Sequence, residues 1–396
     1  MKYILFALSI SLCLSLSAQS WTQVADLPTG RHHPVTFGID GFGYAATGTN
    51  SNNLPTADFY RYDPAADSWT TLNDFPGSAR SFAIGTVYKG KGYLGFGATQ
   101  FAYLNDLWRY DPVADNWTQL ASCPCDGRRH PSLVAVNDAI YVGLGDGIAG
   151  DLDDWWKYDI INDTWSQLPD LPGPGRHHPF QFTVNGQVYA GMGHSGQTIF
   201  GDWYQLDTQT DTWTAMNDFP GEARVAGTQI NHAGKGYVLS GDGDNHSTMP
   251  TGEFWEYDAG SDSWTELTSH PGRSRWAPGS FIVNDELYVL GGLDRQASLL
   301  RREVYKIVMA STLSLPTTAI QNSTLATYPN PVKNYLNIEY KGKIDRIILM
   351  DVTGQTVLSS DAKPGLDLEH LPSGLYFLRI EENGGQIRAQ SRIIKH

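Results

Sequence analysis

Six arginines recur at regular intervals along the chain, each three or four residues after a proline. They are Arg31, Arg80, Arg128, Arg176, Arg224 and Arg275. A guanidinium group presents a planar fork of donors that matches a carboxylate or a sulfate. If the fold brings the six side chains together, they would encircle a binding site for an anionic ligand.

Histidines follow three of these arginines directly. The runs are Arg31-His32-His33-Pro34, Arg128-Arg129-His130-Pro131 and Arg176-His177-His178-Pro179. Imidazole can donate, accept or exchange a proton near neutral pH, so arginine with histidine would suit an acidic sugar. The alternative is that the arginines bond main-chain carbonyls and the histidines pack between strands. The residues alone leave both interpretations open.

A metal site is a further possibility for some of these histidines. It would recruit His32, His130 or His177 together with loop residues, of which the candidates are Asp146, Asp151, Asp242, Asp244 and His246. No spacing among these residues fixes a ligand geometry. We therefore predict no metal and no other cofactor.

Two cysteines lie beside the third arginine, in the sequence Cys123-Pro124-Cys125. A redox pair normally has two intervening residues, so we expect Cys123 to be buried where other repeats carry Leu27 or Phe75. Export to an oxidising space would permit a bridge between the two cysteines, which the sequence does not decide.

The elements that must position these residues form a repeat marked by tryptophan. Trp21, Trp69, Trp117, Trp165, Trp213 and Trp264 are 48, 48, 48, 48 and 51 residues apart. Most of them close the same phrase, as in Tyr62-Asp63 followed by Asp67-Ser68-Trp69. Each repeat holds four short strand-like runs bounded by Gly, Pro, Asn and Asp, and no helical period, which is typical of a β-propeller blade.

The first tryptophan indicates how the ring closes. Trp21 precedes any complete repeat, so we expect residues 20–24 to supply the outer strand of the last blade. The other strands of that blade are predicted near residues 280–283, 287–290 and 304–308, which makes six blades. An open β-solenoid, the alternative, would not need this separate N-terminal strand.

These repeats resemble kelch repeats over residues 20 to 308. The resemblance rests on the glycine-flanked strand ends, the Tyr-Asp pair and the spaced Trp, although most copies have Gly-x-Gly instead of Gly-Gly. It implies an all-β, six-bladed kelch-type β-propeller over 19–308. In such propellers the loops that enter the innermost strands surround one mouth of the central channel, where the arginines and histidines above would then lie.

A second domain is expected after an uncharged linker at residues 309–327. Strand and turn patterns alternate over 328–396, from Tyr328-Pro329-Asn330-Pro331 to Leu371-Pro372-Ser373-Gly374, and favour a small Ig-like β-sandwich. The run resembles the type A C-terminal sorting domain of the type IX secretion system, down to its basic end, Arg392-Ile393-Ile394-Lys395-His396. The resemblance implies recognition by that translocon and removal of the domain at the cell surface. An Ig-like module that binds another partner is the alternative.

The leader and the charge agree with export. Residues 1–18 have the layout of a signal peptide, and no later stretch reaches the roughly twenty apolar residues of a membrane helix. Residues 19–327 hold 18 Lys and Arg against 34 Asp and Glu, a net charge of −16. Such an acidic domain disfavours nucleic acid as a partner. We expect a protein that is secreted or held on the outer-membrane surface.

Two functions fit these features. The first is a binding scaffold for an extracellular glycan or protein partner, because no catalytic motif is found. The alternative is an enzyme similar to sialic acid mutarotases, which occur among six-bladed kelch proteins and would act on an acidic sugar at the channel mouth. The sequence identifies neither the ligand nor the oligomeric state.

Overall fold

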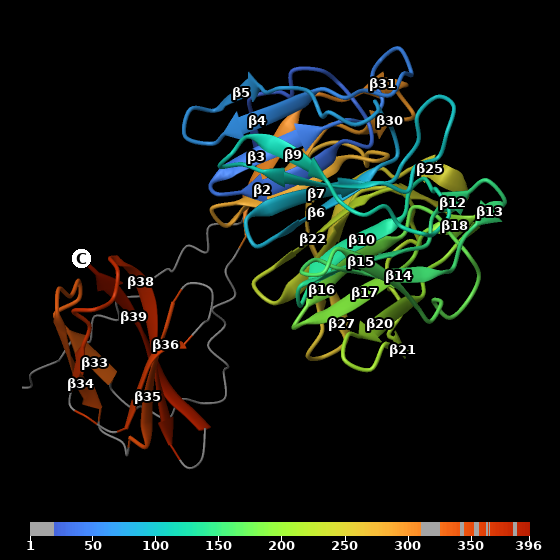
Figure 1. Ribbon diagram of the computed structural model, residues 1–396. Helices are drawn as coiled ribbons and strands as arrows, with labels where there is room; N and C mark the ends of the chain where they lie inside the picture. Colours follow the sequence, from blue (N-terminus) through green and yellow to red (C-terminus); the bar gives the residue numbers. More distant parts are fainter. Residues whose placement is uncertain are drawn as a thin grey trace, which may run out of the picture. The chain divides into compact units, whose positions relative to one another are not determined.

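Each tryptophan-marked repeat folds into a four-stranded antiparallel sheet, and six such sheets form the blades of a propeller (Figure 1). The structure is a computed structural model that describes residues 20–309, 325–340, 344–351, 356–361, 363, 365–382 and 386–396. The predicted signal peptide lies outside the described residues, as does most of the predicted linker. The chain divides into two compact units, one up to residue 311 and one from residue 312.

The strands of a blade follow one another from the channel outward. Blade 1 holds β2 (Val35–Ile39), β3 (Phe42–Ala46), β4 (Phe59–Asp63) and β5 (Ser68–Thr71). Blade 2 holds β6 (Ile84–Tyr88), β7 (Lys91–Gly95), β8 (Leu107–Asp111) and β9 (Asn116–Gln119). Blade 3 holds β10 (Ser132–Val136), β11 (Ala139–Gly143), β14 (Trp155–Asp159) and β15 (Thr164–Leu168).

The other three blades repeat this order. Blade 4 holds β16 (Phe180–Val184), β17 (Gln187–Gly191), β20 (Trp203–Asp207) and β21 (Thr212–Met216). Blade 5 holds β22 (Thr228–His232), β23 (Lys235–Leu239), β26 (Gly252–Asp258) and β27 (Ser263–His270). Blade 6 holds β28 (Gly279–Val283), β29 (Glu286–Leu290), β32 (Val304–Val308) and, as its outer strand, β1 (Thr22–Val24).

The ring closes as the sequence predicts. The N-terminal strand β1 pairs with β32, with Thr22 opposite Lys306 and Val24 opposite Val304. The innermost strands contact one another in the order β2, β6, β10, β16, β22, β28 and again β2. The six-bladed architecture is therefore confirmed, and the open solenoid is wrong.

The repeated tryptophan phrase ties five of the six blades to the connection that precedes them, the exception being blade 2, where the Trp117 indole N–H has no partner. In blade 1 the Trp69 Nε1–H donates to the carbonyl of Ala25 at 3.0 Å, and Asp67 accepts from the Tyr62 hydroxyl and from the Ala25 N–H. The same indole bond joins Trp165 to Ala121 at 2.8 Å. The repeat is thus a set of blade-to-blade contacts, which explains its regular spacing.

Short hairpins join the second strand of each blade to the third. They contain β12 (Asp146–Gly147) with β13 (Gly150–Asp151), β18 (His194–Ser195) with β19 (Thr198–Ile199), β24 (Asp242–Gly243) with β25 (Ser247–Thr248), and β30 (Leu293–Asp294) with β31 (Leu299–Leu300). The blade 5 hairpin also holds a 3₁₀ turn, η1 (Asp244–His246). In blades 1 and 2 single bridges, Thr49 to Pro55 and Ala98 to Tyr103, take their place.

The C-terminal unit has the two sheets of the predicted β-sandwich. One sheet holds β33 (Leu325–Tyr328), β34 (Tyr335–Tyr340) and β37 (Gly365–Asp367), and the other holds β36 (Thr356–Asp361), β35 (Arg346–Met350), β38 (Gly374–Glu382) and β39 (Gln386–Lys395). Leu336 of the first sheet and Leu349 and Leu378 of the second lie in one buried apolar core. Along the described parts of the chain, no helix has the length and apolar character needed to cross a membrane.

Candidate functional site

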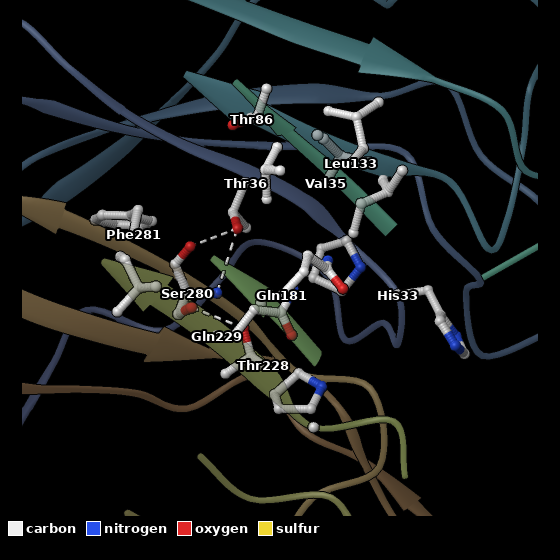
Figure 2. A pocket seen from close by; sticks show the side chains of 18 of the residues that line it. His33, Val35, Thr36, Thr86, Leu133, Gln181, Thr228, Gln229, Ser280 and Phe281 are labelled. Atoms are coloured by element: carbon white, nitrogen blue, oxygen red, sulfur yellow. Dashed lines mark hydrogen bonds between the residues drawn. The ribbon is translucent and has the colours of Figure 1, made fainter. Parts of the chain in front are cut away.

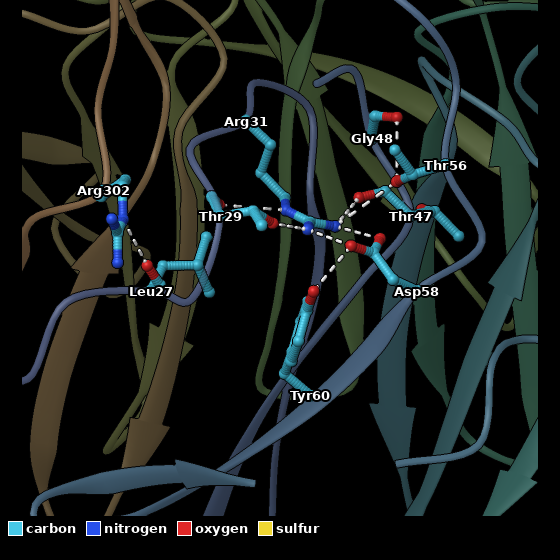
Figure 3. Close-up of polar contacts among 9 residues, drawn as sticks. All are labelled: Leu27, Thr29, Arg31, Thr47, Gly48, Thr56, Asp58, Tyr60 and Arg302. Atoms are coloured by element: carbon cyan, nitrogen blue, oxygen red, sulfur yellow. Dashed lines mark hydrogen bonds and ion pairs between the residues drawn. The ribbon is translucent and has the colours of Figure 1, made fainter. Parts of the chain in front are cut away.

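The six recurring arginines are buried inside the blades. Figure 3 shows Arg31, whose Nη1 donates to the carbonyl of Thr47 at 2.8 Å and to Asp58 Oδ1 at 2.6 Å, while Nη2 donates to Asp58 Oδ2. The side chain of Arg31 is fully buried. Its guanidinium is therefore occupied by a carboxylate and a carbonyl of its own blade.

The other arginines repeat this arrangement with small variations. Arg80, Arg128 and Arg176 form two-pronged ion pairs with Asp106, Asp154 and Asp202. Arg224 pairs with Glu253, whereas Arg275 donates to the carbonyls of Gly291 and Glu303. All six side chains are buried and each donates to acceptors within its own blade, although Nη1 of Arg224 has no partner, so the expected ring of guanidinium groups at the mouth does not form. Their contacts match the structural alternative, in which the arginines bond blade carbonyls.

The residue two positions after each arginine occupies the place at the channel mouth that we expected for the arginines. In all six blades this residue has a positive φ, between 50° and 61°, and the six are His33, Phe82, His130, His178, Ala226 and Ala277. This left-handed conformation is uncommon outside glycine and must be held by its surroundings. Main-chain bonds between neighbouring blades hold it, such as His33 N–H to Ala277 O at 2.8 Å and His130 N–H to Phe82 O at 3.0 Å.

The side chains at this position converge on one end of the channel, which we call the entry face because the innermost strands begin there. The ring of His33 lies 5.0 Å from that of His130 and 5.4 Å from that of His178. The rings of His130 and His178 are 3.6 Å apart. We call these three residues the entry histidines. Blades 1, 3 and 4, far apart in sequence, supply one each.

A chain of hydrogen bonds runs through two of the entry histidines. His32 Nδ1 lies 2.7 Å from His33 Nδ1, His33 Nε2 lies 3.1 Å from His178 Nε2, and His178 Nδ1 lies 3.3 Å from His194 Nε2. The chain ends where His194 Nδ1 meets the carbonyl of Gly196 at 3.2 Å. Since a carbonyl only accepts, His194 carries its proton on Nδ1, and neutral rings must then all donate in the same direction.

Burial keeps these rings neutral. It lowers the pKa of His32 and of His194 to about 4. Burial, with the neighbouring imidazoles and Arg129, holds the pKa of each entry histidine well below its usual value. At neutral pH the ring nitrogens without a proton are therefore free to accept a hydrogen bond or bind a metal.

Two further predicted residues have partners in the loops. His177 Nδ1 lies 2.5 Å from Asp151 Oδ1, and Arg129 pairs with Asp146. Three of the four acidic residues of the suggested metal site thus have side-chain partners, since Asp242 also pairs with Arg295. In the described part of the chain, the groups close enough to share a metal ion contain histidines alone.

The entry histidines line a cavity of about 330 Å³ that extends along the channel. Its wall is polar where the inner strands of blades 1, 4, 5 and 6 face one another, as Figure 2 shows for Thr36, Gln181, Thr228 and Ser280. Thr36 Oγ1 donates to the carbonyl of Ser280 at 2.6 Å, and the Thr228 and Ser280 hydroxyls are 2.7 Å apart. The channel thus offers a small polar pocket behind the imidazoles.

Exposed apolar side chains surround the entry face on four consecutive blades. Leu299 of blade 6, Leu54 of blade 1, Phe101 of blade 2 and Ile148 of blade 3 stand on the second-to-third strand hairpins and are 48%, 41%, 93% and 89% exposed. We call these four residues the apolar arc. The hairpins belong to the entry face because each begins with a bridge to the residue after a recurring arginine, such as His32 to Thr49.

Sequence reasoning missed several residues of this face. Phe82 and Trp276 contact the ring of His33 with centroids 4.8 and 4.6 Å away, and His246 lies 4.5 Å from His194. Phe82 could have been found by its place two residues after a recurring arginine. Cys123 is buried as expected, and the structure bridges it to Cys125.

Two family models match the chain. The model described as the Attractin/LZTR1 beta-propeller matches residues 43–299, and the secretion system C-terminal sorting domain matches residues 326–396. The two matches fall on the propeller and on the C-terminal β-sandwich. No curated protein gives a significant match to the chain.

Proposed function

The chain belongs to the Attractin/LZTR1 beta-propeller family, and from this premise we propose that its propeller binds an extracellular protein through the entry face. The compartment follows from the other domain. The type IX sorting domain engages the type IX secretion machinery and directs export to the cell surface or the extracellular space. The partner is therefore sought outside the cell.

The apolar arc is the observation that supports this proposal. Large apolar side chains gathered on one side of a soluble protein usually mark an interaction surface. Phe101 and Ile148 are almost fully exposed, so burying them against a partner would remove much apolar surface from water. Because the hairpins are anchored to buried arginine loops, little ordering is needed on binding.

A glycan partner has less support on this face. Sugars usually stack on flat aromatic rings, and in the apolar arc only Phe101 is aromatic. The mutarotase-like alternative rested on arginines with histidines at the mouth. The six arginines are buried, five of them in ion pairs, whereas three of the histidines line the channel cavity. Both remain as outcomes that the experiment distinguishes.

The experiment compares two double variants of the secreted protein. Phe101→Ser with Ile148→Ser removes the two most exposed members of the apolar arc. Val113→Ser with Ile161→Ser is the matched control, because these residues are 86% and 75% exposed on turns between third and fourth strands. Each protein is photo-crosslinked to intact cells of the producing culture, and captured proteins are quantified.

We expect the wild type and the control to capture the same protein and the arc variant to lose it. Truncating one anchor of an interface costs about 2 kcal/mol, or about 30-fold in affinity, which the purified partner would then confirm in a direct titration. Equal capture by all three proteins would refute the proposal. Binding on a glycan array that depends on Phe101, without protein capture, would assign a sugar instead.

A further inference from the structure

We propose that the entry histidines, His33, His130 and His178, together bind one Zn²⁺ ion. The site goes beyond the proposed partner surface, since it lies at the centre of the entry face and uses none of the apolar arc. One ring nitrogen of each histidine lies within 4.8 Å of those of the other two. Each of the three histidines comes from a different blade, so no local sequence motif identifies the site.

The backbone aims the three rings at one point. His33, His130 and His178 have φ values of 53°, 50° and 52°, a conformation that ordinary residues adopt only when the surroundings enforce it. In the same turn of blades 5 and 6 the residues are Ala226 and Ala277, which leave room beside the imidazoles. Three equivalent positions around a ring thus present three ligands of one type.

His130 supplies the second, independent observation. Both of its ring nitrogens are buried, and neither has a hydrogen-bond partner among the described residues. Buried polar atoms are rarely left in this state, and an unsatisfied group is costly. A bound metal ion would satisfy the nitrogen that faces the other two rings.

Contacts around His33 and His178 prepare their Nε2 atoms as ligands. The two Nε2 atoms are 3.1 Å apart, close to the roughly 3.4 Å that Zn–N bonds of about 2.1 Å would set. The Nδ1 atoms lie at hydrogen-bond distance from His32 and His194. Metal-binding histidines typically have their second nitrogen hydrogen-bonded in this way, with the proton on that atom. His178 already has this tautomer, whereas in His33 the proton must move from Nε2 to Nδ1, where it would be donated to His32 Nδ1.

The ligand types select the metal. Three neutral imidazoles without a carboxylate suit Zn²⁺ and its neighbours in the first transition row, whereas Ca²⁺ and Mg²⁺ need oxygen ligands. All three rings line the same channel cavity of about 330 Å³. A fourth ligand would therefore enter from the channel, as water or as a donor atom of a bound partner.

A second group, His177, His178 and His194, shares one residue with this set and is the competing site. Two of its members already have other partners, because His177 contacts Asp151 and His194 contacts the carbonyl of Gly196. A metal ion bound by the entry histidines would give a partner to a buried nitrogen of His130 that otherwise has none, so this set is favoured over the competing one. The two sets differ in whether His130 or His194 is required.

The test uses the full secreted chain, purified without a histidine tag and stripped with a chelator that is then removed. Zn²⁺ binding is measured by calorimetry, and bound metal is counted by elemental analysis. The variants are His130→Gln, His33→Gln and His194→Gln. His232→Gln is the control, since this histidine lies outside the cluster and contacts Asp285.

We expect one Zn²⁺ per chain in the wild type and the control, and at least a 100-fold weaker affinity in the His130 and His33 variants. The His194 variant should lose less, because it removes a contact to a ligand and not a ligand. Absence of stoichiometric binding by the wild type would overturn the proposal, as would full binding by His130→Gln. Loss in His194→Gln alone would place the ion in the competing group.

Folding defects would not obscure the result. Tryptophan fluorescence of each variant checks the propeller, since all 12 tryptophans lie before residue 277. The wild type loaded with Co²⁺ reports the ligands without any substitution, because a four-coordinate, nitrogen-bound ion gives an intense visible spectrum. A spectrum of hexahydrated Co²⁺ would count against the site.

Discussion

Replacing Arg128 by Met tests how much a recurring arginine stabilises the blade that contains it. The arginine is fully buried and makes four hydrogen bonds, two to Asp154 at 2.7 and 2.9 Å and two to the carbonyls of Leu144 and Asp126 at 3.1 Å. Methionine has a similar length and no donor. The substitution therefore leaves one carboxylate and two carbonyls without their shared partner.

The expected cost follows from the exposure of the partners. Removing one member of a buried ion pair typically costs about 3 to 5 kcal/mol, because the remaining charge stays desolvated. The side chain of Asp154 is 23% exposed, so water can solvate part of its charge. We therefore expect the lower end, a loss of about 3 kcal/mol in the free energy of unfolding.

The neighbouring residue supplies a matched control. Arg129→Met makes the same chemical change one residue later, where the side chain is 33% exposed and pairs with Asp146. A pair of this kind is worth about 0 to 1 kcal/mol. Guanidinium unfolding followed by tryptophan fluorescence measures both, and the signal reports the propeller because the C-terminal unit has no tryptophan.

Two results would refute this reasoning. One is an equal, small loss of stability in both variants, which would mean that the fully buried arginine contributes no more than the partly exposed one. The other is additivity of Arg128→Met and Asp154→Leu, since residues in direct contact should show a coupling energy of about 1 to 3 kcal/mol. A double variant more stable than Arg128→Met alone is the expected outcome.

Three further predictions concern pH, packing and the disulfide. Burial lowers the pKa of His270 to about 3. Below pH about 6.5, the pKa in the unfolded chain, the unfolded chain binds a proton at this residue that the folded chain does not bind. Between pH 7 and 4.5 the free energy of unfolding should therefore fall by about 2 to 3 kcal/mol more in the wild type than in His270→Gln, as unfolding measured at several pH values would show. A Cβ on Gly38 would lie 1.9 Å from the carbonyl oxygen of Ile282 in the adjoining blade; Gly38→Ala should therefore cost at least about 2 kcal/mol in the same unfolding assay, and a silent substitution would contradict the packing. Reducing the Cys123–Cys125 bridge opens a loop with one intervening residue, so the free energy of unfolding measured with and without reductant should differ by less than about 2 kcal/mol.

The propeller could be predicted because its determinants recur. The Tyr-Asp and Trp phrase recurs because in five of the six blades its tryptophan makes the same contact to the preceding connection, as Trp69 does with Ala25. The early Trp21 indicated the closing strand because it arrives before any complete blade. Contacts that recur from blade to blade require the same residues at a regular spacing, and the number of these repeats in the sequence gives the number of blades.

The candidate site was harder to predict because the sequence repeat does not show in which direction a side chain points, toward the channel or into the blade. An acid follows each of the six recurring arginines at 26 to 29 residues, as Asp58 follows Arg31, and this spacing was the available sign that the guanidinium points into the blade. The left-handed φ of His33 has no such sign, since inter-blade hydrogen bonds enforce it. Residue types located the entry face, but the backbone decides which side chains reach its centre.

The pairing of β1 with β32 joins the first strand of the propeller to be synthesised with the last. Thr22 emerges from the ribosome well before its partner Lys306, about 280 residues later, which takes on the order of tens of seconds at about 5 to 20 residues per second. Until β32 has been made, β1 has no partner strand, and its backbone groups can pair with another chain. Blade 6 is therefore completed by the strand of the propeller that is synthesised first, β1. A protease that cleaves after Val24 would remove this strand, which closes the ring.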